Sequence, residues 1–462
     1  MLIVNCLLLF SSLTADKQAT QRAIELQVRV EVRRDRSGWL ATYRLPPGHN
    51  WLFAHSARAR ATEQPWRPRS WTVVTPGVRI ARAGEYDVLT GSSGSTPSVV
   101  RIRFEPFAQS VIADNDPALQ LSDGTVALFT DQFDVLPAAK LASVSAAGDD
   151  IDRATIGSAR TAVTFRNRLG NVLLSGRAQP KVETANAETY AVFVNGRRPL
   201  DVRANAFVDP ALPSWIRAEV QPLLLSTIDD YSARLGPLRA TSPVLVAQWT
   251  GPTPRTSGMG GSVVKDVVVM NFEGDGLLVE NQQVRDRARL FVAHEAVHFW
   301  LGQQTRVAER RHRWITEGGA ELMATRTIAG RDASFTPSLR LNALVKECSA
   351  LLAGGSLSAI ADQGNDRVHY ACGTVLALVA EGASGGEFDR FLKDIMKIAD
   401  RDEGVLTPGD WTGHLRGSGK VQLAERVEEL LTKRLSSPAD YIDRLLADAG
   451  VARDVRVSAD TK

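Results

Sequence analysis

The residues best suited to chemistry lie in one stretch, residues 291–325. Within it, residues 294–298 read HEAVH, which places two imidazoles four residues apart with a carboxylate beside the first; Glu317 follows eighteen residues later. Residues i and i+4 share one face of a helix, so His294 and His298 can bind a single ion at roughly 2.0–2.1 Å. The spacing therefore predicts a zinc site held by His294, His298 and Glu317, with Glu295 as the general base.

Three protein ligands are typical of a catalytic zinc, because the fourth tetrahedral position stays open to water. Zinc would lower the pKa of that water toward 7 and polarise a carbonyl group. A glutamate beside the site could then take the proton of the water and pass it to a leaving amine. The alternative is a pair of helix-surface histidines near a buried glutamate.

Two helices must carry these residues. Apolar periodicity predicts the first over residues 280–303 and the second over residues 316–325, with Thr316 as its cap and Glu317 in its first turn. Glu321 lies four residues after Glu317 and therefore on the same face. Metal-bound histidines usually donate their second ring N–H to a carboxylate, so we expect Glu321 to orient one of them. The alternative is a solvent-facing acid.

A strand is expected before the first helix. Residues 262–272 read SVVKDVVVMNF and follow a glycine-rich loop at 251–261. The loop lacks the Gly-Lys-Ser/Thr ending of a P-loop, which argues against a nucleotide site. We expect the strand to form one wall of a cleft in which an extended peptide pairs with the exposed edge.

The motifs resemble those of the gluzincin metallopeptidases, specifically the membrane alanyl aminopeptidase family, whose zinc signature is HExxHxWxG followed by WxxEGxAE. Beyond the bare zinc motif, the matching residues are Trp300, Gly302, Trp314, Glu317, Gly318, Ala320 and Glu321. The resemblance covers residues 255–385. It implies a thermolysin-like catalytic domain, zinc as the cofactor, and a peptide or protein as the substrate.

The resemblance also implies an oxyanion donor. In that family, a tyrosine in a Tyr-x-x-Gly segment at the start of a later helix donates a hydrogen bond to the tetrahedral oxyanion. This chain has YACG at residues 370–373, and we assign that role to Tyr370. The alternative is an ordinary tyrosine at the start of a helix.

One departure from the family concerns the substrate's end. Aminopeptidases of this family bind the α-amine of the substrate with the glutamate of a Gly-x-Met-Glu-Asn segment. The corresponding residues 258–262 read GMGGS and offer no carboxylate, while Glu273 lies further along. Exopeptidase and endopeptidase action therefore both stay open.

The length of 462 residues favours two or three domains. A composition of 44% hydrophobic and 23% charged residues is typical of a soluble globular protein. Apolar and polar residues alternate with the period of a β-strand up to about residue 208, for example at residues 99–104. From residue 213 on, apolar residues recur with the period of a helix. We expect an α+β protein: an N-terminal all-β domain (16–207), then a thermolysin-like, mostly helical zinc-peptidase domain with a small edge sheet (208–455).

Residues 1–15 (MLIVNCLLLFSSLTA) form an apolar run of secretory-signal length that is too short to span a bilayer. We therefore predict a signal peptide and export to the periplasm or the medium; a buried N-terminal strand or a misplaced start codon is the alternative. No later stretch approaches the roughly 20 apolar residues of a membrane helix. Export would permit Cys348 and Cys372 to pair, the alternative being two buried thiols.

The net charge of +3 gives no reason to expect a nucleic-acid surface. Residues 66–71 (WRPRSW) interleave basic and aromatic side chains, as single-strand binders do, but we favour a solvated strand face. Two other functions compete with peptide hydrolysis: a zinc hydrolase acting on an ester or epoxide, and a non-catalytic binding protein on a peptidase scaffold. No feature of the sequence indicates an oligomeric state.

Overall fold

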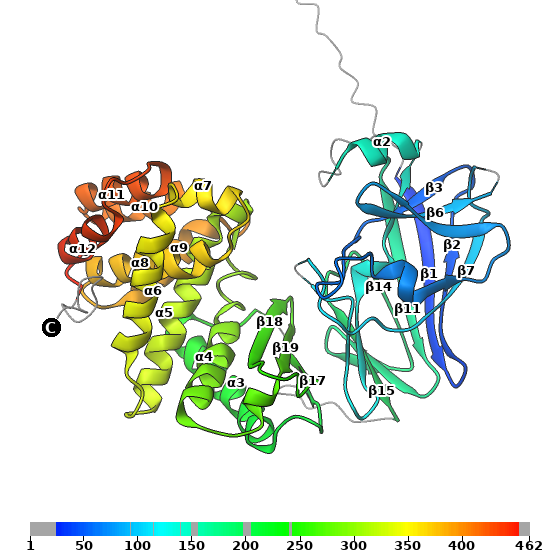
Figure 1. Ribbon diagram of the computed structural model, residues 1–462, viewed down its shortest axis with the longest axis horizontal. Helices are drawn as coiled ribbons and strands as arrows, with labels where there is room; N and C mark the ends of the chain where they lie inside the picture. Colours follow the sequence, from blue (N-terminus) through cyan, green and yellow to red (C-terminus); the bar gives the residue numbers. More distant parts are fainter. Residues whose placement is uncertain are drawn as a thin grey trace, which may run out of the picture.

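The computed structural model describes residues 25–92, 94–113, 115–138, 140–148, 156–196, 205–239 and 243–451. A β-rich part reaches Asn195, and a mostly helical part starts at Asn205; the two lie side by side (Figure 1). The expected signal peptide at residues 1–15 lies outside the described residues.

The β-rich part contains short strands with few helical turns. Its strands are β1 Leu26–Asp35, β2 Gly38–Arg44, β3 Asn50–Phe53, β4 Trp71–Val73, β5 Val78–Ala83, β6 Tyr86–Gly91, β7 Val99–Phe104, β8 Ala118–Gln120, β9 Val126–Phe129, β10 Val135–Ala138, β11 Ala159–Asn167, β12 Gly170–Leu174, β13 Arg177–Gln179, β14 Lys181–Ala185 and β15 Tyr190–Asn195. Its helical turns are α1 Arg67–Ser70, η1 Thr130–Phe133 and α2 Leu141–Ala146.

Among the described residues, these strands form three sheets, in the orders β14-β11-β1-β2-β7-β4, β10-β3-β6-β5 and β13-β12-β15-β9-β8. Alternation in the sequence explains their packing: Val28, Val30 and Val32 of β1 are buried, whereas the residues between them are exposed. The first sheet thus turns one apolar face toward a core that includes the aromatic rings of Tyr43 and Phe165.

The segment at residues 66–71 is not the solvated strand face that we expected. Arg67 is fully buried, pairs with Asp87 at 2.8 Å and lies under the rings of Trp66 and Trp71. A buried charge needs such a partner, and the aromatic faces add cation–π contact. Trp66, Arg67 and Trp71 therefore belong to the core of the β-rich part, whereas Arg69 is exposed.

The helical part begins with one small sheet. Its strands are β16 Asn205–Val208, β17 Val244–Gly251, β18 Gly258–Val264 and β19 Val267–Glu273, and their order is β16-β17-β19-β18. β18 is the edge strand and runs antiparallel to β19. Residues 205–207, which we expected in the β domain, pair with β17 in this sheet.

Helices build the rest of this part. They are α3 Ser214–Leu235, η3 Asp275–Leu277, α4 Gln282–Val297, η4 Arg310–His312, α5 Trp314–Arg331, α6 Pro337–Leu352, α7 Leu357–Asp362, α8 Arg367–Ala383, α9 Phe388–Ala399, α10 Pro408–Gly417, α11 Val421–Thr432 and α12 Pro438–Asp448; β20 Arg306–Val307 and β21 Val405–Leu406 form a two-stranded pair. No helix among the described residues combines the length and apolarity that crossing a bilayer requires.

Three local predictions were wrong. The single strand expected at residues 262–272 is instead the end of β18, a turn at Lys265 and most of β19. Lys265 has φ of 54°, a left-handed conformation that reverses the chain. The zinc-bearing helix is shorter than residues 280–303. The second helix begins at Trp314 after Arg313, so Thr316 lies inside α5 and does not cap it.

An apolar cluster packs the two parts against each other, and a disulfide links two helices of the helical part. An apolar cluster joins residues of β9 and β15, such as Phe129 and Val192, to Val246 of β17 and Val269 of β19. Within the helical part, Cys348 of α6 and Cys372 of α8 form a disulfide, with both residues fully buried. The structure therefore shows a disulfide rather than two buried thiols.

Candidate metal centre

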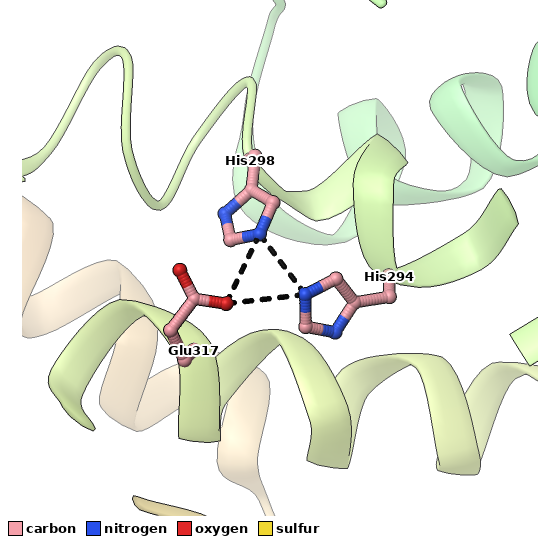
Figure 2. Close-up of side chains that lie close together, drawn as sticks. All are labelled: His294, His298 and Glu317. Carbon is pink, nitrogen blue, oxygen red and sulfur yellow. Dashed lines mark hydrogen bonds and ion pairs between the residues drawn. The ribbon is translucent and has the colours of Figure 1, made fainter. Parts of the chain in front are cut away.

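Three side chains converge between α4 and α5 (Figure 2). Nε2 of His294 lies 3.0 Å from Nε2 of His298 and 3.2 Å from Oε2 of Glu317, and the third side of this triangle is 3.5 Å. Ligands of a tetrahedral zinc ion at roughly 2.0–2.1 Å are about 3.3 Å apart. The three donor atoms therefore fit a zinc ion by both chemistry and spacing.

The ends of the two helices place these ligands. Asn281 caps α4 by accepting a hydrogen bond from the backbone N–H of Val284, and His298 is the first residue beyond the last turn. Glu317 lies in the first turn of α5. Burial alone would raise the pKa of Glu317, but the imidazoles of His298 and His294 hold it well below its usual range. The carboxylate is thus charged and available as a ligand.

Each histidine has a second group at its other ring nitrogen. Nδ1 of His298 lies 2.8 Å from the carbonyl oxygen of Leu301, which fixes Nε2 as the metal-facing nitrogen. Nδ1 of His294 lies 3.7 Å from Oε1 of Glu321. Glu321 therefore lies behind His294, at a distance slightly too long for the hydrogen bond that we predicted.

Glu295 is the acid beside the three ligands. Only 5% of its surface is exposed, and Oε2 has no hydrogen-bond partner among the described residues. Burial raises its pKa above the usual range, and the nearby imidazoles offset part of that shift. A carboxylate with a raised pKa and a free oxygen can take up a proton at neutral pH.

Tyr370 reaches the same site from α8. Its ring stacks on the imidazole of His294 at a centroid distance of 5.8 Å. Burial and the carboxylates of Glu317 and Glu295 raise the pKa of Tyr370 well above its usual value. The phenol therefore stays protonated and can donate a hydrogen bond to a developing negative charge.

Two glycines bring Tyr370 and Glu317 together. A Cβ added to Gly318 would lie 2.0 Å from the carbonyl carbon of Gly373, so α5 and α8 touch backbone to backbone there. Glu317 precedes Gly318, and Tyr370 lies one turn before Gly373 on α8. Both glycines belong to the family motifs, but the sequence did not reveal that they pack on each other.

Arg340 is a further residue of the site that could not be predicted from the sequence. Its Nη2 donates a 2.9 Å hydrogen bond to Oε2 of Glu321, which links α6 to the residue behind His294. No local spacing relates Arg340 to the motif, because the contact depends on how α6 packs against α5.

The segment at residues 258–262 forms most of β18 and borders the site without a carboxylate. A Cβ on Gly261 would lie 3.2 Å from Cδ of Glu295, so the strand passes directly beside this acid. Glu273 is opposite Gly258 at the far end of the hairpin and accepts a hydrogen bond from Thr253 at 2.6 Å. Neither β18 nor Glu273 therefore places a free carboxylate beside Glu295.

No protein-family model matches the chain, and no curated protein sequence matches it. Among solved structures, it is similar to an aminopeptidase N family protein from Idiomarina loihiensis, with 10% identity, a TM-score of 0.56, and coverage of 90% of this chain and 78% of that one. An M1 zinc metallopeptidase from Deinococcus radiodurans matches at 14% identity and a TM-score of 0.48, over 90% and 95% of the two chains. The first of these similarities shows that the chain has the α+β fold of an aminopeptidase N family protein.

Proposed function

We propose that this protein is a zinc-dependent peptidase. The observation that carries the proposal is the convergence of His294, His298 and Glu317 at zinc-ligand spacing, with Glu295 and Tyr370 beside them, on a fold similar to that of an aminopeptidase N family protein. The three ligands would hold the ion. Zinc in such a site supplies a Lewis acid that polarises a carbonyl group and makes water nucleophilic at neutral pH.

The residues of the chain divide the remaining work. Glu295, buried and with one oxygen free, accepts the proton of the attacking water and passes it to the leaving amine. Tyr370 donates a hydrogen bond to the oxyanion that forms on the scissile carbonyl. The carbonyl of Leu301 orients the imidazole of His298, and the carboxylate of Glu321 faces Nδ1 of His294 at 3.7 Å.

The proposed substrate is a peptide whose amino end need not be free. An aminopeptidase must neutralise an ammonium group close to the scissile bond, and an acid is the group suited to this. β18 presents glycines beside Glu295 where such an acid could stand. We therefore propose that the enzyme cleaves peptides with blocked amino ends.

The test compares two peptides of one sequence, with an acetylated and with a free amino end, after metal analysis of the purified chain. We expect bound zinc and cleavage of both peptides. Cleavage of the free peptide alone would establish an exopeptidase, and turnover of small esters without peptide cleavage would favour the ester or epoxide hydrolase. Absence of both zinc and cleavage would refute the proposal.

Export and the domain boundary belong to the same proposal. A disulfide between Cys348 and Cys372 is typical of an oxidising compartment, which supports export by the apolar run at residues 1–15. We place the boundary between the N-terminal β domain and the catalytic domain just before β16, so that the β16–β19 sheet belongs to the catalytic domain; this is close to the expected boundary at residue 207.

A further inference from the structure

The outer edge of β18 is open only in its middle. β18 pairs with β19 without a bulge from Gly258 to Val264, and no described strand pairs with its other side. In an antiparallel strand, alternate residues turn both their N–H and C=O groups to the same side. The carbonyl of Val263 accepts a 2.8 Å hydrogen bond from the side chain of Gln303, so Val263 faces outward. Gly261 and Met259 must then face outward as well.

Side chains occupy the two ends of this edge. Gln303 binds the carbonyl of Val263 and also accepts a 3.1 Å hydrogen bond from the N–H of Lys265. At the other end, Nη2 of Arg287 donates a 2.5 Å hydrogen bond to the carbonyl of Ser257. The described residues place no partner on the outward groups of Met259 and Gly261. Unpaired groups of this kind are a template for an added strand.

The open part of the edge adjoins the site. A Cβ added to Gly261 would lie 3.2 Å from Cδ of Glu295, whereas a Cβ added to Gly260 would meet nothing within 4 Å. A peptide that pairs with Gly261 and Met259 therefore passes Glu295, and the opposite face of the strand is open at Gly260. Antiparallel addition, which is slightly the more stable arrangement, would direct the carboxyl end of the peptide toward Ser257.

Arg287 stands where that end of the peptide would arrive. Arg287 is exposed, its guanidinium donates hydrogen bonds to the carbonyl and hydroxyl of Ser257, and no acidic side chain among the described residues pairs with it. Ser257 is four residues from Gly261, or roughly 13 Å along a strand. An arginine with unused donors at that point is suited to a carboxylate.

With an extended peptide paired at Met259 and Gly261, as expected for this edge, we propose that Arg287 binds a carboxylate on the leaving-group side of the peptide and that Gln303 closes the other end of the edge. The inference rests on the proposed peptidase function and specifies its substrate. This substrate is a peptide with a carboxylate three or four residues C-terminal to the residue that pairs with Gly261. The peptide's own C-terminus and an acidic side chain are the two sources of that carboxylate, and antiparallel pairing favours the C-terminus.

The test measures kcat/KM of the zinc-loaded full chain on acetylated peptides of one sequence that end in a free carboxylate or in an amide. We expect about a tenfold preference for the carboxylate, which corresponds to one charge-assisted hydrogen bond. The preference should disappear in Arg287→Met and partly return in Arg287→Lys. Arg285→Met is the matched control, because Arg285 lies on the same helix and pairs with Glu280 and Glu219.

A third peptide separates the two sources of the carboxylate. If an amide peptide with a glutamate near its end is preferred in the parent and not in Arg287→Met, the site takes an acidic side chain. Equal kcat/KM for all peptides in the parent, or a preference that survives Arg287→Met, would overturn the proposal while leaving peptidase function intact. Failure to cleave any peptide would instead overturn the peptidase function on which the proposal rests.

Gln303 provides a second measurement. Gln303→Ala frees the backbone groups of Val263 and Lys265, so lengthening the peptide by two residues on its amino side should raise kcat/KM about tenfold in this variant and much less in the parent. Gln304→Ala is the control, because Gln304 instead lies 3.4 Å from the carbonyl of Pro237. The same response to length in the parent and in Gln303→Ala would show that Gln303 does not close the edge.

Discussion

Replacing Gly318 with alanine should separate the two helices that carry Glu317 and Tyr370. The added Cβ would lie 2.0 Å from the carbonyl carbon and 2.2 Å from the carbonyl oxygen of Gly373. Ordinary van der Waals contact begins at 3.4 Å, so the backbones of α5 and α8 must move apart by about 1.4 Å. No rotamer change can relieve a clash between backbone atoms.

The expected cost has two parts. Overpacking of this kind costs about 1–3 kcal/mol, and the better helix propensity of alanine returns about 1 kcal/mol, so we expect a net loss of up to about 2 kcal/mol. A displacement near 1 Å at a catalytic site can reduce turnover about hundredfold. We therefore expect Gly318→Ala to lower kcat far more than it lowers stability.

Gly319→Ala is the matched control for this prediction. Its Cβ would meet Cδ1 of Leu301 at 2.7 Å, the end of a flexible side chain that can turn away. Thermal unfolding and kcat of the two variants, measured on an acetylated peptide, give the comparison. Parent-like kcat in Gly318→Ala, or equal losses in both variants, would refute the view that the Gly318–Gly373 contact sets the position of Tyr370.

Three further predictions concern the site. Tyr370→Phe should retain zinc and lower kcat about 10²–10³-fold, because the oxyanion loses a donor; an unchanged kcat would exclude this role. Arg340→Met should weaken zinc affinity about tenfold in a chelator competition, whereas Arg326→Met, which breaks an ion pair of similar exposure away from the ligands, should not. Burial alone would lower the pKa of His298, but the neighbouring acids, above all Glu317, raise this pKa to about 9 in the metal-free chain. His298 is therefore protonated at pH 7. Zinc uptake at pH 7 should then release about one proton, and the release should fade above pH 9; calorimetry in buffers of different ionisation enthalpy would detect this, and no release at pH 7 would contradict it.

The sequence was informative where function depends on local spacing. His294 and His298 share a helical face whatever surrounds the helix, and Glu321 follows Glu317 by one turn, so both relations could be predicted. The turn at Lys265 was missed because a lysine with positive φ gives no turn signature between two apolar runs. Arg67 was misread because burial depends on the neighbouring sheets.

Contacts between distant elements lay beyond the sequence. Arg340 reaches Glu321 only because α6 packs against α5, and Gln303 reaches Val263 only because the chain turns back after α4. Each such contact joins residues whose separation in the sequence carries no periodic signal. Their roles could therefore be proposed only from the packed structure.

The central claim is that His294, His298 and Glu317 hold a catalytic zinc ion with Glu295 as the base. The most direct test is the zinc content and peptide turnover of the purified parent and of Glu295→Gln, measured in parallel. We predict about one zinc per chain in both proteins and a loss of turnover of about 10²–10⁴-fold in the variant. A parent without zinc, or a variant that turns over like the parent, would contradict the claim.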